Sequence, residues 1–466
     1  MRRFFVFALI ALLAVSAVGP AGAADGALKV PPFKKVVLNN GLTLLLMEQH
    51  EVPIISLNFI VQSGSVADPV GKEGTASATA ALLRKGTKSR TADQISNELD
   101  FVGGQLDSDA TFDYSSGTAE FVKKDIAKGL DLLADILLNP TFPQDEVTKL
   151  LKQRIDEIKA AKDEAQAVIG NYFRAYLYVR HPYGRPANGD EKSIAAITRA
   201  DVLNFYQTYY SPRNTILSVV GDFETAAMEQ TLRGRFGDWK GPVPEKRKPL
   251  LAAQAVAGKK LLLVDKPDST QTFFQIGNLG IARTNPDRVF IQVVNTLFGG
   301  RFTSMLNTEL RIKTGLTYGA RSSFIQHQNP GPFVISTYTR NETTEKAIDM
   351  TIEILKRLHE KGVTEEDLKS AKTYLKGQFP PTIETSDQLA DLLAQLEFYG
   401  LDASDVNGYY AKIDSMTMAD ARRVINQYFP MENLVFVLIG KAAEIEPIAR
   451  KYAPTIDKKA ISQPGF

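Results

Sequence analysis

Two residue types that often build functional sites are missing or rare in this chain. It contains no cysteine among its 466 residues, so disulfides and thiolate metal ligands are excluded, and stability must come from the burial of apolar side chains. Histidine occurs only as His50, His181, His327 and His359, and no two of these lie within one helical turn. A zinc site that uses two histidines of one helix is therefore not expected.

Neither sign of charge dominates the chain. Its 55 lysines and arginines are balanced by 53 aspartates and glutamates, which gives a formal net charge of +2. Because no basic stripe with interleaved aromatic residues is present, we do not expect nucleic acid as a partner. The chain is longer than the roughly 150 residues of a typical domain, so it predicts a soluble, globular protein of more than one domain.

One long apolar run is present, and it lies at the N-terminus. Arg2 and Arg3 precede apolar residues 4–18, and the small residues 21–23 follow. This order is typical of a signal peptide over residues 1–23, which predicts export, in a bacterium to the periplasm. A retained membrane anchor is the weaker alternative, because a spanning helix needs roughly 20 apolar residues. The two arginines also leave twin-arginine export open.

The order of predicted elements occurs twice along the chain. Residues 197–201 and 416–420 resemble each other, as do residues 214–221 and 433–440. The offset stays near about 220 residues, which indicates two copies of one structural unit. Strand and helix patterns alternate in each copy, so we expect two α+β halves, each a mostly antiparallel sheet with flanking helices. The halves are predicted at residues 28–240 and 259–457, with a proline-rich, semi-stiff linker at residues 241–258.

Local signals place several elements of the first half. Residues 36–47 show a hairpin pattern around an Asn-Asn-Gly turn, and residues 54–61 alternate as a strand does. The small residues of 71–86 favour a helix. Capping signals begin further helices after Thr91 and Thr198. In the second half, Thr364 and Met416-Thr417 stand at the matching helix starts.

The stretch at residues 298–318 carries the strongest functional signal. Gly299 and Gly300 break an apolar run, and a helix with Leu306 and Leu310 on its apolar face is expected to follow, ending at Gly315. Residues 316–318 are expected to begin a strand. Arg311 would then lie in the last turns of the helix and Tyr318 just beyond the reversal. Taken alone, such an arginine usually complements the helix dipole, and such a tyrosine usually packs.

The pattern Gly299-Gly300, Leu310-Arg311 and Gly315-Leu316-Thr317-Tyr318 resembles the second half of the pitrilysin (insulinase, mitochondrial-processing-peptidase) family. The resemblance covers nearly the whole mature chain. It implies tandem α+β halves in a clam-shell arrangement. It also implies that Arg311 and Tyr318 bind the peptide substrate.

The same resemblance shows what this chain has lost. Active members carry the zinc motif His-x-x-Glu-His just before a Leu-x-Lys-Gly-Thr sequence, which here is residues 83–87. By that spacing Ser77 stands at the position of the first histidine, Ala80 at that of the glutamate and Ala81 at that of the second histidine. Glu157 matches the downstream zinc glutamate, although an exposed helix carboxylate is the favoured reading. No zinc cofactor is therefore expected on this chain.

The resemblance also guides the expectations for the remaining candidate positions. The strand near residues 105–114 resembles the edge strand that pairs with extended substrate in this family. His181 is expected to anchor a loop, whereas His50 and His327 are expected to be solvated.

Loss of the zinc motif with retention of Arg311 and Tyr318 resembles the non-catalytic subunit of the family's two-subunit peptidases. This predicts a periplasmic, substrate-binding subunit whose partner is a homologous chain with an intact motif. Zinc would then be bound by that partner, and the substrate would be a peptide or unfolded protein. The alternative is a stand-alone peptide-binding or assembly protein from the same family. An independent hydrolase with Ser77 as nucleophile is remote, because no histidine lies nearby in sequence.

Overall fold

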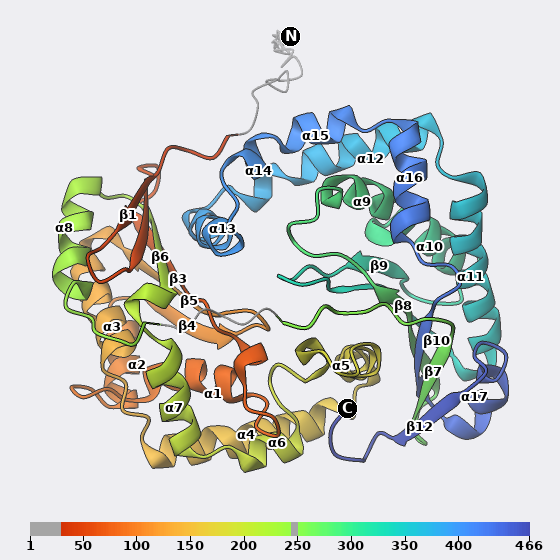
Figure 1. The fold of residues 1–466 in the computed structure, drawn as a ribbon, viewed down its shortest axis with the longest axis horizontal. Coiled ribbons are helices and arrows are strands. Elements are labelled where there is room, and N and C mark those ends of the chain that lie inside the picture. The colour runs from red at the N-terminus through yellow and green to blue at the C-terminus, as the bar shows by residue number, and fades with distance from the viewer. Residues whose placement is uncertain (1–28, 244–249) are drawn as a thin grey trace, which may run out of the picture.

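The structure, a computed structural model, describes residues 29–243 and 250–466. These residues form two α+β halves, each built on a six-stranded sheet (Figure 1). The predicted signal peptide at residues 1–23 lies outside the described residues, as does part of the predicted linker. Within the described ranges, no helix combines the length and the apolar character that crossing a membrane requires.

The first half contains the strands β1 to β6 and the helices α1 to α8. The strands are β1 (Lys34–Val37), β2 (Thr43–Glu48), β3 (Ile54–Val61), β4 (Gln105–Ala110), β5 (Ser115–Val122) and β6 (Thr215–Gly221). The helices are α1 (Thr75–Leu82), α2 (Ala92–Phe101), α3 (Ile126–Leu138), α4 (Gln144–Ala161), α5 (Ala165–Leu177), α6 (Glu191–Ala196), α7 (Arg199–Tyr209) and α8 (Thr225–Phe236).

The second half contains the remaining elements. The strands are β7 (Lys260–Asp265), β8 (Gln271–Leu279), β9 (Arg321–Phe324), β10 (Pro332–Arg340), β11 (Val435–Gly440) and β12 (Ile456–Ala460). The helices are α9 (Arg288–Asn295), α10 (Met305–Asn307), α11 (Thr344–Lys361), α12 (Glu365–Gln378), α13 (Ser386–Tyr399), α14 (Ser404–Asn407), α15 (Tyr409–Ser415), α16 (Met418–Tyr428) and α17 (Ala442–Ala449).

The two sheets confirm the predicted repeat. The first has the order β1-β2-β6-β3-β5-β4 and the second the order β12-β7-β11-β8-β10-β9, so five strands correspond one to one. In each sheet the corresponding strands form a parallel pair, β2 with β6 and β7 with β11, beside antiparallel pairs. The outermost strands differ, since β1 pairs antiparallel with β2 whereas β12 pairs parallel with β7.

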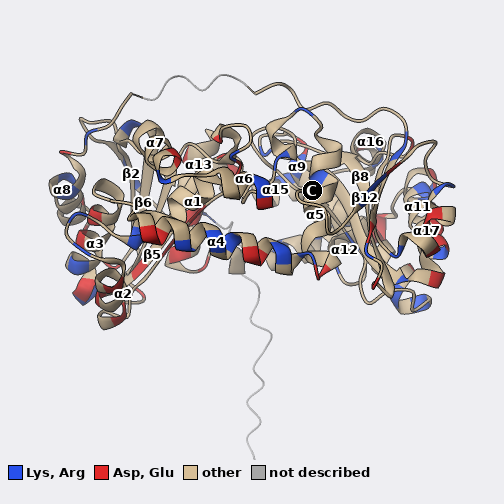
Figure 2. Cartoon of the chain, turned by 90° about the horizontal axis from the view of Figure 1, so that it is seen from below, with Lys and Arg blue, Asp and Glu red and all other residues tan. Residues whose placement is uncertain are grey.

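Most of the local predictions are confirmed. The Asn-Asn-Gly turn joins β1 to β2, with Gly41 at a φ of 95°. Side-chain capping boxes begin α2, α7, α12 and α16. The helix predicted over 71–86 is shorter, because α1 begins only after Gly74, at a φ of 96°, and tightens into a 3₁₀ turn at Leu83–Lys85. Charges of both signs are interspersed over both halves, as Figure 2 shows.

Each half lends one helix to the sheet of the other. Helix α5 of the first half packs on β8 and β11, and helix α13 of the second half packs on β3 and β6 (Figure 1). Val168 and Tyr172 of α5 lie in one core with Val437 of β11. Leu393 of α13 lies in another core with Ile60 of β3. The sequence repeat did not predict this exchange, because an apolar helix face does not identify the sheet that it covers.

A loop of the second half docks on the first half beside two histidines. The backbone N–H groups of Gln328 and Asn329 donate to Asp113 Oδ2 (2.9 Å) and to the Tyr183 hydroxyl (3.1 Å). His327 lies between the rings of Phe112 and Tyr183, with centroids 5.1 and 4.9 Å away. The expectation that His327 is solvated is therefore wrong, because the loop after β9 folds back onto the first half.

His181 is buried at the same junction, and the expectation that it anchors a loop is confirmed. Its Nδ1 accepts a hydrogen bond from the Tyr183 N–H at 3.1 Å. Burial lowers the pKa of both imidazoles. For His327, Asp113 opposes this effect, whereas Arg174 and His181 add to it. Burial at this junction therefore favours the neutral form of both side chains.

We expect mild acid to destabilise this junction. An imidazole of the unfolded chain titrates near 6.5, so below that pH the unfolded state binds more protons than the folded state. The free energy of unfolding should therefore fall as the pH drops through this value. Thermal unfolding followed from neutral to mildly acidic pH checks this. The variant His327→Gln should remove up to about one proton from the linkage, and an unchanged acid dependence would count against the assignment.

Candidate functional site

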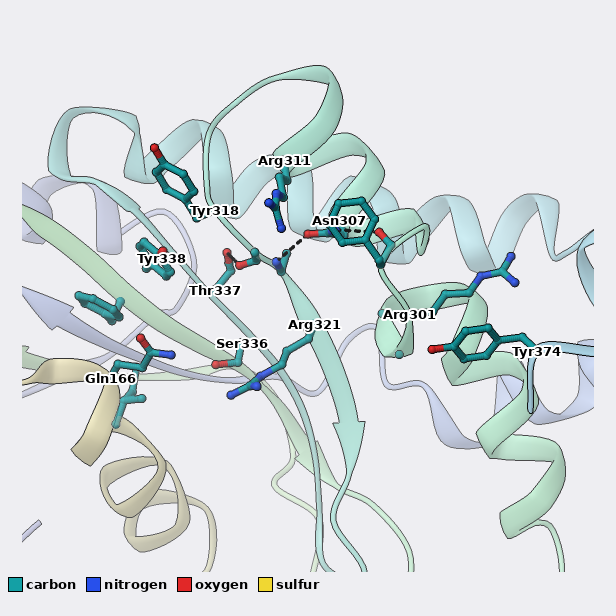
Figure 3. A pocket seen from close by; sticks show the side chains of 17 residues that line it. Gln166, Arg301, Asn307, Arg311, Tyr318, Arg321, Ser336, Thr337, Tyr338 and Tyr374 are labelled. Atoms are coloured by element: carbon teal, nitrogen blue, oxygen red, sulfur yellow. Dashed lines mark hydrogen bonds between the residues drawn. The ribbon is translucent and has the colours of Figure 1, made fainter. Parts of the chain in front are cut away.

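A cavity of about 490 Å³ lies between the second sheet and the start of α5 (Figure 3). Residues 299–302 and 318–321 supply much of its wall, and Gln166 of α5 contributes from the first half. Arg311 and Tyr318 both line this cavity. The structure thus brings together the two residues that the sequence singled out.

Gly299, the first glycine of the Gly-Gly pair, is required by close packing. Helix α9 continues as a π-helical turn over Thr296–Gly300. A Cβ on Gly299 would lie 2.4 Å from the Ser322 backbone nitrogen and 2.8 Å from Leu306 Cδ1, so only glycine fits. The turn can therefore lie directly against β9, and it delivers the following loop to the rim of the cavity.

The predicted helix after the glycines is present in an unusual form. Helix α10 begins after Ser304 and continues as a π-helical turn over Thr308–Lys313, with Leu306 and Leu310 buried. Gly315 follows at a φ of 63°, as expected of a helix C′ residue. The Arg311 guanidinium lies over the Phe302 ring, 4.8 Å from its centroid. This contact holds the cation at the cavity by cation–π attraction.

The prediction that residues 316–318 begin a strand is wrong. The N–H groups of Leu316 and Thr317 both donate to the Leu310 carbonyl oxygen, at 2.9 and 3.3 Å, so the chain is still closing the helix end. Strand β9 begins only at Arg321. The apolar and β-branched residues after Gly315 favoured a strand, but their backbone groups are already bound to the helix.

Threonines of β10 hold the loop that carries Tyr318. Thr337 Oγ1 donates to the Gly319 carbonyl oxygen at 2.9 Å, and Thr339 Oγ1 donates to the Leu316 carbonyl oxygen at 2.7 Å. With the loop fixed on both sides of Tyr318, the Tyr318 side chain projects outward and is 79% exposed. Its hydroxyl makes no hydrogen bond to the part of the chain that the structure describes. The phenol is thus free to bind a group from outside this chain.

Sequence reasoning missed Asn307, which joins the two walls of the site. Its Nδ2 donates to the Phe302 carbonyl oxygen at 2.7 Å, and its Oδ1 accepts from the Ala320 N–H at 3.3 Å. The side chain is buried. A polar residue in an amphipathic helix usually faces solvent, so the sequence carried no signal for this role.

A second cavity, of about 500 Å³, contains the position of the lost zinc motif. Arg154 of α4 donates from Nη1 to Ser77 Oγ at 2.9 Å and from Nη2 to the Ser77 carbonyl oxygen at 3.2 Å. Ser77 Oγ donates in turn to Asp109 Oδ1 at 2.5 Å. Burial lowers the pKa of Arg154, and the charges of Asp109 and Glu157 oppose this effect. A guanidinium therefore lies against the first position of the motif.

These residues do not fit a zinc ion. A guanidinium has no lone pair to donate and repels a second cation, and Ala80 and Ala81 offer only methyl groups. Residues 29–243 and 250–466 contain no group of three histidine, cysteine, aspartate or glutamate side chains arranged to hold a metal. The Ser77 hydroxyl is hydrogen-bonded to Arg154 and Asp109, and no histidine is among its partners within the described residues.

Two further predicted features can be placed. Glu157 is exposed at the rim of the second cavity, and its Oε1 accepts from Gln153 Nε2 at 2.8 Å. Strand β4 lies at the edge of the first sheet, as expected from the resemblance. Its backbone is therefore placed where an added strand could pair.

Comparison with known proteins identifies the family. Residues 44–191 match the model described as insulinase (peptidase family M16), and residues 196–375 match the model described as peptidase M16 inactive domain. The chain belongs to the M16 peptidase family, which confirms the resemblance seen in the sequence. The inactive-domain match begins at residue 196, in the first half, and extends into the second half as far as residue 375, and the first half lacks the zinc motif.

Relatives of this chain have similar lengths. It is 26% identical to an uncharacterized zinc protease of Rickettsia felis, over 92% of this chain and 97% of the relative. It is 25% identical to one of Mycobacterium leprae, over 84% of this chain and 88% of the relative.

Two solved structures share the fold. One, from Pseudomonas fluorescens and described as a peptidase M16 inactive domain, has a TM-score of 0.82 at 24% identity, over 92% of this chain and 99% of that one. A protease from Helicobacter pylori has a TM-score of 0.83 at 23% identity, over 88% of this chain and 100% of that one. The two-half α+β fold is therefore that of the family.

Proposed function

We propose that this chain is the non-catalytic, substrate-binding subunit of a two-subunit zinc endopeptidase of the M16 family. The observation that carries the proposal is the contrast between the two cavities. In one, Arg311 and the exposed Tyr318 are presented with their polar groups available. In the other, Arg154 lies against the position of the lost zinc motif. The retained residues, Arg311 and Tyr318, suit peptide binding. The zinc motif, which would cleave the peptide, is the part that this chain has lost.

Each retained residue has a distinct role in this proposal. The planar guanidinium of Arg311 suits a peptide carbonyl or carboxylate, which it can bind with two parallel hydrogen bonds. The Tyr318 hydroxyl suits the oxyanion that forms when the peptide carbonyl is attacked. A partner subunit with an intact His-x-x-Glu-His motif would bind the zinc that activates water. The predicted signal peptide would direct this chain to the periplasm.

The decisive experiment mixes this chain with a homologous chain that carries the intact motif. Each chain alone and the mixture are assayed with an internally quenched peptide. We expect hydrolysis only from the mixture, together with a stable complex in size-exclusion chromatography. Hydrolysis by this chain alone would overturn the proposal. If the mixture is inactive but this chain still binds peptides, the stand-alone peptide-binding alternative is favoured.

A further inference from the structure

The cavity that holds Arg311 has an uncompensated positive charge. Arg301, Arg311 and Arg321 line it, and no aspartate or glutamate does. Their contacts within the described residues are neutral: Arg301 Nη1 donates to Ser370 Oγ at 2.9 Å, and Arg311 lies over Phe302. Three like charges around one concave space raise its positive potential and favour an anion.

Some arginines elsewhere in the described structure are instead bound by carboxylates. Arg90 is bound by three carboxylates, those of Glu98, Asp131 and Asp135, at 2.7 to 3.1 Å. Arg423 is bound by Asp287 at 2.6 Å. The chain has nearly equal numbers of acidic and basic residues, yet no carboxylate joins the three arginines that line this cavity.

The arginines approach the cavity from different elements. Arg311 enters from the π-helical turn, and Arg321, the first residue of β9, extends toward Ser336 and Gln166 (Figure 3). Arg301 lies farther out, beside Tyr374. Arg321 is exposed and lies opposite Ser336 in the strand pairing, so it is free to follow a ligand.

The size of the cavity limits the anion that it can hold. A space of about 490 Å³ accepts one or two side chains of a peptide but not a folded polyanion. Carboxylate is the anion that peptides carry, and it forms paired hydrogen bonds with guanidinium. We propose that this cavity selects a carboxylate of the bound peptide and that Arg321, in addition to Arg311, determines this specificity. The inference rests on the proposed peptide-binding function and names its substrate class.

Three labelled peptides that differ in one feature test the inference on this chain alone. The first carries a central glutamate and an amidated C-terminus, the second a glutamine and the same amide, and the third a glutamine and a free C-terminus. We expect one of the two carboxylate-bearing peptides to bind about tenfold more tightly than the neutral one at low salt. The glutamate peptide identifies a side-chain carboxylate, and the third peptide identifies the terminal carboxylate.

Substitution of Arg321 then assigns the preference to this side chain. Arg321→Ala should abolish the tenfold preference and leave the affinity for the neutral peptide within about twofold. Arg340→Ala is the matched control, since Arg340 is an exposed arginine at the far end of β10 that does not line the cavity. Equal affinity of the native chain for all three peptides would overturn the inference, and so would a preference that survives Arg321→Ala. Because no partner is present, a failure of hydrolysis in the mixture leaves this result unaffected.

Discussion

Tyr318→Phe should slow peptide hydrolysis by the assembled pair of subunits about 100-fold while leaving the pair intact. The variant removes a single hydroxyl from a side chain that is 79% exposed and has no hydrogen-bond partner among the described residues. The fold of this chain therefore does not depend on that hydroxyl. In the proposed function, this hydroxyl stabilises the negative charge that develops on the substrate carbonyl oxygen. That charge is absent when the substrate is bound in its ground state.

Steady-state kinetics of the mixture separate this role from simple binding. For Tyr318→Phe, kcat should fall with little change in KM, whereas Arg311→Ala should also weaken substrate binding. Tyr410→Phe is a suitable control, because it deletes a hydroxyl that donates to the Lys376 carbonyl oxygen, away from the cavity. Full activity of both cavity variants would refute the roles given to Arg311 and Tyr318.

Restoring the zinc motif should not restore zinc binding while Arg154 is present. The triple variant Ser77→His, Ala80→Glu, Ala81→His supplies the two missing histidine ligands and the missing glutamate base, with Glu157 on the neighbouring helix. However, the guanidinium that now binds Ser77 would face a divalent cation at short range. Repulsion of this kind is worth several kcal/mol in a partly buried site, so adding Arg154→Ala should raise zinc affinity about 100-fold or more.

Matched variants make this test specific to charge. Arg154→Lys in the same triple background keeps a cation at the site, and its zinc affinity should stay low. Zinc titration against a competing chelator gives the affinities, and thermal unfolding shows whether each variant is folded. Tight zinc binding by the triple variant with Arg154 intact would show that the guanidinium does not block the site.

The sequence predicted the features that depend on residues close together along the chain. The caps at Thr91 and Thr198 and the turn at Gly41 depend on side chains and backbone angles within a few positions, and the structure has them all. The resemblance also selected Arg311 and Tyr318, which share one cavity. Even so, the start of β9 was misplaced, because hydrogen bonds back to Leu310 override the strand propensity of the residues that follow.

What the sequence did not predict depends on residues that are distant along the chain. Arg154 and Ser77 are 77 positions apart, and nothing local marks either as the partner of the other. Arg321 is a candidate for anion binding only because no carboxylate lines the cavity with it, and the order of residues along the chain does not show this. The exchange of α5 and α13 likewise requires knowledge of which sheet each helix covers.

The exchanged helices determine how the molecule responds to a break in its chain. A protease that cuts between residues 241 and 258 would leave two fragments. One helix of each fragment would still be packed on the sheet of the other fragment. Separating them would strip α5 from β11 and α13 from β3, exposing side chains such as Tyr172 and Leu393 to water. A nicked molecule should therefore stay associated, and neither fragment should be obtainable as a stable protein by itself.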